Sequence, residues 1–222
     1  MERRKRAGHK YSGGSVFFSK LICGECGGFY GSKVWHSNTK YRKVIWQCNA
    51  KIKDKTGCQT PHLTDGEIRE KFIEAMNRLL KDRDSVLANL DILRQTAEDT
   101  AGLQTDFDVL AAQMELLAKE QDDLIHKNAR QALDQEQYTK EFYELDRQFK
   151  AKQDEYERLS GEMDKAKSAV DLITDFKGKL AGLKQTVTEF DIDLWGEMVE
   201  SVTVQKDGKL VFRFKAEIEI TV

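Results

Sequence analysis

The most regular feature of the sequence is a heptad pattern of apolar residues in its second half. Spacings of four and three alternate along a first stripe, which consists of Leu103, Phe107, Leu110, Met114, Leu117, Gln121 and Leu124. After a polar break the same spacing resumes along Tyr138, Phe142, Leu145, Phe149, Lys152, Tyr156, Leu159, Met163, Ala166, Val170 and Ile173. Because such spacing with charged flanks is typical of coiled coils, the two stripes predict an antiparallel helical hairpin over 96–180 with its tip near 128–135. A packed helix bundle is the alternative, but it needs a broader apolar face than this seam.

The segment before the hairpin carries the start signal of a helix. Thr64 and Glu67 have the spacing of a capping box, in which each side chain binds the other residue's backbone N–H. Apolar residues then recur at helical spacing, at Ile68, Phe72, Ala75, Met76 and Leu79. Polar residues at 82–84 predict an interruption of this helix, and weak patterning at 96–102 predicts a bend or joint.

Strand patterns flank the helical region on both sides. Residues 16–22 predict a first strand, and 31–36 and 40–47 predict a two-stranded ribbon. Near the other end, Asp207 and Gly208 form the signature of a type I′ turn between two apolar strands. Since two strands alone are not stable, we expect this C-terminal hairpin to return to the N-terminal ribbon and complete its sheet.

Four cysteines lie in the N-terminal part of the chain, at Cys23, Cys26, Cys48 and Cys58. The first two form a Cys-x-x-Cys flanked by glycines, the usual shape of a zinc knuckle, and four thiolates complete one tetrahedral Zn²⁺ site of structural type. The second pair has a wider spacing, so His36 or His62 remains an alternative to one of the four cysteines. Disulfides in a secreted domain are a second alternative, and a redox Cys-x-x-Cys, which needs a βαβ context, is a third.

These patterns together predict an α+β fold that is mostly α. The predicted parts are a basic arm at 1–15, a zinc β-ribbon with its first helix at 16–95, the coiled coil at 96–180, and the β-hairpin at 181–222. The coiled coil would then be an insertion in a single zinc domain, with both helix ends anchored there.

Charge divides the chain into two parts. Residues 1–60 carry 13 Lys and Arg against 3 Asp and Glu, whereas 61–222 carry 23 against 35. The basic end predicts a nucleic-acid surface. Its candidate DNA contacts are Lys5, Arg6, Lys33, Lys40, Arg42, Lys43, Lys51, Lys53 and Lys55. An unstructured tail for the first two, and a solvated face for some of the others, are the alternatives. Trp35 and Tyr41 fit core or sheet positions better than base readers.

Other functional classes find little support in the sequence. No apolar run is long enough to span a membrane, and the basic start is not followed by the apolar segment of a signal peptide. We therefore expect a cytoplasmic, DNA-associated bacterial protein. No paired-carboxylate, Ser/His/Asp or phosphate-loop pattern predicts an enzyme or a small-molecule substrate. Catalysis by the thiols would require a reactive cysteine of lowered pKa in the metal-loaded protein.

Several segments resemble one family of proteins. Residues 18–28 with both knuckle cysteines, then Tyr41, Trp46, Cys48 and Cys58, resemble the zinc β-ribbon of large serine recombinases, which are the integrases and transposases of phages and mobile elements. The segment 135–138 resembles the acidic and tyrosine-containing tip of their coiled coil, and 190–214 resembles their closing β-hairpin.

The resemblance implies site-specific DNA recombination through a phosphoserine link. The nucleophile would lie in an N-terminal resolvase-like domain that is absent here, so we expect no DNA cleavage by this chain alone. The zinc ribbon would read the outer part of a double-stranded attachment half-site. The coiled coil would contact other recombinase subunits and control synapsis, with Leu133 and Tyr138 as candidate contacts at its tip. A zinc-stapled coiled coil that binds only proteins is the alternative.

Overall fold

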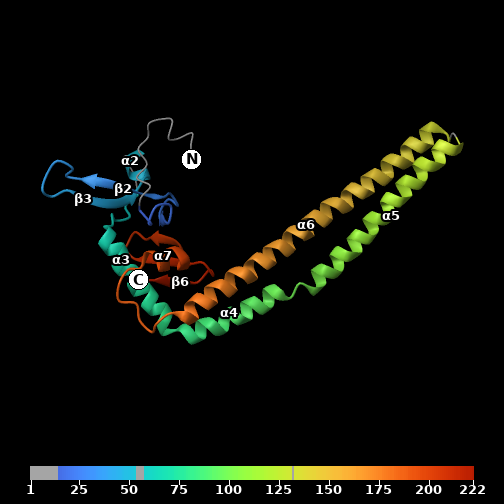
Figure 1. Ribbon diagram of the computed structural model, residues 1–222. Coiled ribbons are helices and arrows are strands. Elements are labelled where there is room, and N and C mark those ends of the chain that lie inside the picture. The colour runs from blue at the N-terminus through green and yellow to red at the C-terminus, as the bar shows by residue number, and fades with distance from the viewer. Residues whose placement is uncertain (1–14, 54–57, 132) are drawn as a thin grey trace. The chain divides into compact units, whose positions relative to one another are not determined.

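The computed structural model describes residues 15–53, 58–131 and 133–222 of the chain (Figure 1). Its internal contacts divide it into two units. One contains the described residues up to Leu90 together with Asp175–Val222, and the other is Asp91–Thr174. Helices dominate and the sheets are small, which confirms the predicted α+β, mostly α class.

The first unit is built on a four-stranded sheet with the order β1-β4-β5-β6. These strands are β1 (Leu21–Cys23), β4 (Val199–Val204), β5 (Leu210–Phe214) and β6 (Glu219–Thr221). β1 and β4 pair in parallel, with Leu21 opposite Val202 and Cys23 opposite Val204. The C-terminal hairpin thus returns to the N-terminal part of the chain as predicted, but it pairs with β1 and does not complete the sheet of the ribbon.

The ribbon is a separate antiparallel pair, β2 (Tyr30–Trp35) and β3 (Lys43–Cys48). Single bridges connect it to its surroundings, from Ile22 to Phe29 and from Trp46 to Leu63. A four-residue helix, α2 (Ala50–Lys53), follows β3. Residues 54–57, which come next, lie outside the described residues.

The predicted first strand at 16–22 is wrong over most of its length. Strand pairing begins only at Leu21, and residues 16–20 form turns in which Ser19 has a φ of 63°. The reason is the position of Phe17, which is fully buried. Its ring centroid lies 5.0 Å from that of Trp195 and 6.0 Å from that of Trp46, so the chain must turn to place this ring in the core.

An aromatic cluster joins the sheet to two helices. α3 (Asp65–Lys81) contributes Phe72, and the short helix α7 (Ile192–Met198) contributes Trp195, whose ring centroids are 5.3 Å apart. Phe212 of β5 lies 6.3 Å from Trp195 and is also fully buried. Large aromatic rings each bury about 150–250 Å², so this cluster supplies much of the apolar driving force of the first unit.

The predicted capping box at the start of α3 is present. The Thr64 hydroxyl accepts the backbone N–H of Glu67 at 3.2 Å, and the Glu67 carboxylate accepts that of Thr64 at 2.6 Å. The backbone N–H of Thr64 holds the pKa of Glu67 below its usual value. Two free N–H groups at the helix start are thereby satisfied.

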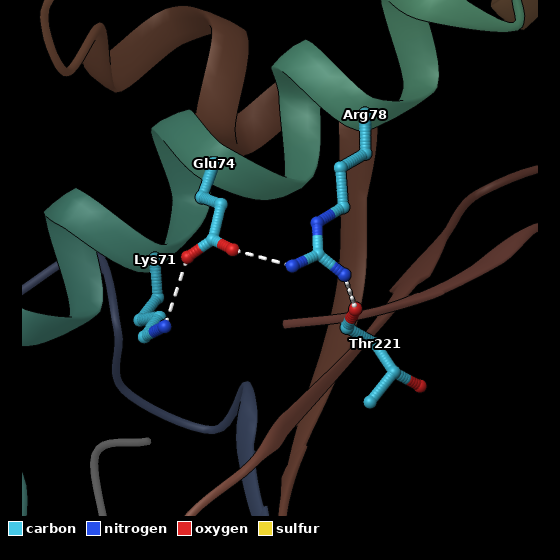
Figure 2. A network of polar contacts seen from close by, with 4 residues as sticks. All are labelled: Lys71, Glu74, Arg78 and Thr221. Atoms are coloured by element: carbon cyan, nitrogen blue, oxygen red, sulfur yellow. Dashed lines mark hydrogen bonds and ion pairs between the residues drawn. The ribbon is translucent and has the colours of Figure 1, made fainter.

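Polar side chains of α3 and of the start of the next helix hold distant parts of the chain. In Figure 2, Glu74 pairs with Lys71 and Arg78, and Arg78 donates to the carbonyl of Thr221 in β6 at 2.5 Å. The adjacent residue, Asn77, exchanges two hydrogen bonds with the backbone of Val187, at 2.8 and 2.9 Å. Arg83 donates to the carbonyl of Leu183 at 2.7 Å. These contacts fasten the segment that follows the long second helix of the hairpin.

The second unit is a long helical hairpin. α4 (Arg83–Glu98) leads into it, and α5 (Ala101–Gln131) and α6 (Gln135–Gly182) run side by side (Figure 1). The rings of Phe107 and Tyr156 stack at 4.1 Å between the two helices. Leu110 and Leu159 are buried, and all other positions of the two predicted stripes are at least partly buried. The predicted antiparallel hairpin is therefore confirmed, with the seam that the heptads indicated.

Both predicted breaks of the helical region occur. α3 ends at Asp82, and α4 and α5 are separated at Asp99 and Thr100, within the joint expected at 96–102. At the tip, the Asp134 carboxylate accepts the backbone N–H groups of Glu136 and Gln137 at 2.9 and 3.0 Å and so caps α6. α5 ends at Gln131 and α6 begins at Gln135, so the tip falls within the predicted interval.

Leu110→Ala should destabilise the helical hairpin. The side chain is 4% exposed, and removal of a buried leucine costs about 2–5 kcal/mol through lost burial and the cavity left behind. Thermal unfolding followed by circular dichroism at 222 nm should show an earlier transition. Leu116→Ala in the same helix is the matched control, because Leu116 is 57% exposed and its truncation should change stability by less than about 0.5 kcal/mol. Equal effects of the two substitutions would contradict the seam.

Asn77→Ala should destabilise the first unit by about 1–3 kcal/mol, because it leaves the backbone N–H and carbonyl of Val187 without their partner. Chemical denaturation measures the change. Glu70→Ala, at an exposed position of the same helix, is the control and should be nearly neutral. Faster amide hydrogen exchange at Val187 in the Asn77 variant would locate the effect, and unchanged exchange would argue against it.

Candidate metal centre

The structure brings the four cysteines together at one point. Their sulfur atoms all lie within 4.8 Å of one another. Cys23 ends β1 and Cys48 ends β3, and both are buried, whereas Cys26 lies exposed in the turn after β1 and Cys58 is half-buried. Four thiolates at about 2.3 Å from a tetrahedral Zn²⁺ lie about 3.8 Å from one another, so this cluster fits the ion.

The first pair of cysteines is held by a compact turn. The backbone N–H of Cys23 donates to the carbonyl of Gly28, and that of Gly27 donates to the carbonyl of Cys23, both at 2.8 Å. Gly27 has a φ of 70°, a conformation that side chains disfavour. Gly28 then directs its N–H at the sulfur of Cys26, 3.4 Å away. The glycines predicted to shape the knuckle do so at these positions.

Hydrogen bonding makes the thiols unequal. Burial raises the pKa of Cys23, but hydrogen bonds from the Thr60 hydroxyl and from the backbone N–H groups of Cys26 and Glu25 outweigh it and lower this pKa to about 6. Burial raises the pKa of Cys48, and the neighbouring thiol of Cys26 raises that of Cys58. Crowded thiols of this kind resist joint ionisation without a cation, so metal binding must be coupled to proton release.

Neither histidine belongs to the cluster that the described residues form. The group that could hold a metal consists of the four cysteines. The ring of His62 stacks on Trp35 at 4.7 Å, and His36 is exposed in the turn of the ribbon, where its φ is 52°. Four cysteines complete a tetrahedral shell with no open position for substrate, which makes this a structural zinc site. The chain therefore has one structural zinc, as the sequence predicted.

The structure places some of the predicted DNA contacts, while others lie outside the residues that it describes. On the ribbon, Lys40 and Arg42 are exposed in the turn between the strands, Lys43 is exposed at the start of β3, and Lys33 is half-buried on β2. Lys51 on α2 is half-buried and donates to the carbonyl of Thr60. The others are not placed: Lys5, Arg6 and Lys55 lie outside the described residues, as does the side chain of Lys53.

Two aromatic residues of the ribbon behave differently from each other. Trp35 is a half-buried sheet residue, as expected, with the ammonium of Lys43 5.4 Å from its ring centroid. Tyr41 is neither core nor sheet: it lies in the turn and is 68% exposed, so that expectation is wrong. The reason is the late start of β3 at Lys43, which leaves Tyr41 outside the strand pairing.

At the hairpin tip, the two predicted contact residues lie together. Leu133 and Tyr138 are half-buried and line one small hollow with Lys127, Asp134, Gln137 and Glu141.

Several residues around the metal centre were missed by reasoning from the sequence. The carboxylate of Glu25 accepts the backbone N–H of Gln59 at 2.6 Å, and the Tyr30 hydroxyl donates to the carbonyl of Pro61 at 2.9 Å. The hydroxyl of Thr60 lies 3.4 Å from the sulfur of Cys23. Only the position of these residues beside the cysteines in the sequence could have drawn attention to them.

Comparison with known proteins supports the assignment of a zinc ribbon in this part of the chain. Residues 16–77 match the family model of the recombinase zinc beta ribbon domain. No curated protein matches the chain. A solved structure described as "Crystal Structure of a LSR-DNA Complex" is similar over 96% of this chain and 61% of its own, with 13% identity and a TM-score of 0.34.

The chain therefore carries a recombinase zinc beta ribbon domain with a complete set of four cysteine ligands. This confirms the predicted resemblance to a recombinase zinc β-ribbon over residues 16–77.

No helix in the part of the chain that the structure describes is both long enough and apolar enough to cross a membrane.

Removal of the metal should unfold the ribbon selectively. Metal analysis should find one zinc per chain, and Cys48→Ser should abolish it, because a buried ligand is lost. A chelator should then destabilise the first unit and leave most of the helical signal of the hairpin. His36→Ala and His62→Ala serve as controls and should retain one zinc each. Loss of zinc in either histidine variant would overturn the four-cysteine assignment.

Proposed function

We propose that this chain is the DNA-binding and synapsis-regulating C-terminal part of a site-specific serine recombinase that integrates, excises or transposes a mobile element. The observation that carries the proposal is the recombinase zinc ribbon at residues 16–77, which contains the whole metal centre and the basic ribbon. DNA cleavage and rejoining would belong to a catalytic serine domain elsewhere in the parent protein.

The ribbon has the shape and charge of a DNA-docking element. Its turn exposes Lys40 and Arg42, and Lys43 is exposed at the start of β3. Val34 and Val44 face each other across the strands and are 46% and 38% exposed, although both are apolar. A two-stranded ribbon fits the major groove of B-form DNA, where basic side chains reach phosphates and apolar side chains reach thymine methyl groups. Charge and exposure thus support binding through the end of the ribbon farthest from the metal.

Zinc supports this role without taking part in chemistry. Cys48 lies directly at the end of β3, so the ion fixes the root of the ribbon whose other end carries the basic turn. The closed shell of four thiolates leaves no position for a substrate. We therefore assign the metal to folding and the exposed cations to DNA.

The helical hairpin is the proposed regulatory arm. Its seam uses the apolar residues of both limbs, and its outer surface carries ion pairs such as Glu144–Arg147 and Arg158–Glu162. The tip offers a hollow between Leu133 and Tyr138 that a side chain from another subunit could fill. Contacts of this kind would favour or prevent synapsis of two DNA-bound complexes.

Removal of the ribbon's exposed cations should weaken DNA binding and its salt dependence. The double substitution of Lys40→Ala with Arg42→Ala removes two phosphate contacts, so the slope of log K against log salt should fall by roughly 2, at about 0.9 per phosphate. Binding to a random-sequence 30-base-pair duplex is measured by fluorescence anisotropy from low to physiological salt. Lys206→Ala, an exposed lysine in the β4–β5 turn, is the control and should leave the slope unchanged.

A protein that binds no duplex at any salt concentration would contradict this proposal. The zinc-stapled coiled coil would then stand as a protein-interaction module.

A further inference from the structure

The second pair of zinc ligands lacks the compact turn that holds the first. Cys23 and Cys26 are bound into one knuckle by backbone hydrogen bonds. Cys48 and Cys58 are ten positions apart, and no Cys-x-x-Cys joins them. Bringing two ligands with this separation to one metal ion costs more conformational entropy than a Cys-x-x-Cys does, so further contacts are needed to fix the approach of Cys58 to the metal.

The structure supplies contacts for this purpose on the segment 59–61, directly after Cys58. Glu25 accepts the backbone N–H of Gln59 at 2.6 Å. Lys51 donates its ammonium hydrogen to the carbonyl of Thr60, and the Tyr30 hydroxyl donates to that of Pro61 at 2.9 Å. We name the segment 59–61 with its three partners Glu25, Tyr30 and Lys51 the latch.

Each partner lies close to a zinc ligand, either along the chain or across the ribbon. Glu25 lies between Cys23 and Cys26 in the first knuckle, Tyr30 pairs with Cys48 in the ribbon, and Lys51 follows Cys48 on α2. The latch therefore connects the segment after the fourth ligand to the elements that hold the other three.

Thr60 brings the latch into direct contact with the metal ligands. Its side chain is 0% exposed, and among the residues that the structure describes it is the one polar residue that is buried. Its hydroxyl lies 3.4 Å from the sulfur of Cys23. A buried hydroxyl without a hydrogen-bond partner lowers the stability of the fold, and the hydrogen bond to the Cys23 sulfur avoids this cost.

The negative charge of the metal centre also favours a lysine at position 51. Four thiolates around one divalent cation leave two surplus negative charges, and a nearby ammonium group offsets part of them. Its hydrogen bond to the Thr60 carbonyl also directs toward the latch one of the three donors of an ammonium that the basic sequence around Lys51 would assign to a phosphate.

We propose that Glu25, Lys51 and Thr60 are positioning residues of the zinc centre, and that Lys51 serves the metal and not the DNA. The latch replaces the missing second knuckle and slows the departure of zinc. Residues that orient metal ligands from outside the coordination shell change metal affinity by about 10–100-fold when they are removed.

The test is the rate at which the full-length, zinc-loaded chain transfers its metal to an excess of a chromogenic chelator. Lys51→Met, Thr60→Val and Glu25→Ala should each release zinc about 10-fold faster than the unchanged protein. Lys51→Arg, Thr60→Ser and Glu25→Gln keep the donor, hydroxyl or acceptor, and should restore slow release. This rescue separates positioning from a general loss of packing, and it keeps the test decisive if a non-conservative variant fails to fold.

Lys40→Met is the matched lysine control, because Lys40 is exposed in the ribbon turn. It should release zinc at the unchanged rate and should weaken binding to a random-sequence duplex. Lys51→Met should release zinc faster and leave binding to the duplex unchanged. Lys51→Met with unchanged zinc release overturns the proposal, and weaker DNA binding in that variant would make Lys51 a phosphate contact. The zinc measurement needs no DNA, so failure of the chain to bind a duplex refutes the proposed function and leaves this inference intact.

Discussion

The parallel pairing of β1 with β4 is the constraint on which the rest of the structure depends. The backbone N–H of Val202 donates to the carbonyl of Lys20, and that of Gly24 donates to the carbonyl of Val204. Cys23 ends the first of these strands, so a zinc ligand is fixed to a strand that the chain makes only after the whole helical arm. A Cβ at Gly24 would lie 3.0 Å from the carbonyl oxygen of Val204, so a side chain there would press on the backbone of β4. All four zinc ligands lie before the helical arm, but the sheet that holds Cys23 is complete only when the chain on both sides of the arm is present.

Local and periodic signals made much of this fold predictable. The heptads predicted the helical seam, the capping box predicted the start of α3, and Asp207-Gly208 predicted the place of the closing turn. The predicted type I′ is wrong, because Gly208 has a φ of 87° but Asp207 has no positive φ. The zinc ligands were also predictable, because the sequence contains four cysteines and four thiolates complete one tetrahedral zinc site. Each of these signals lies within a short window of sequence or repeats at a fixed period.

Long-range contacts could not be read in this way. Phe17 leaves the strand pattern because its ring packs between Trp46 and Trp195, which lie far away in the chain. Lys51 looked like any other lysine of a basic segment until the structure placed Thr60 beside it. Tyr41 was misassigned because a shift of the β3 start by three residues separates a strand position from an exposed turn. Such outcomes depend on the partners that tertiary folding brings together.

The insertion of the arm between paired parts of one domain has a consequence for how such proteins can vary. Its two limbs share the same heptad repeat. Whole heptads can therefore be gained or lost in matched pairs, one in each limb, while the seam and the metal centre stay as they are. Each such step changes the reach of the arm by roughly 10 Å, at ~1.5 Å per residue. Reach is thus a property that evolution can adjust in discrete increments, independently of the DNA surface and of the zinc site.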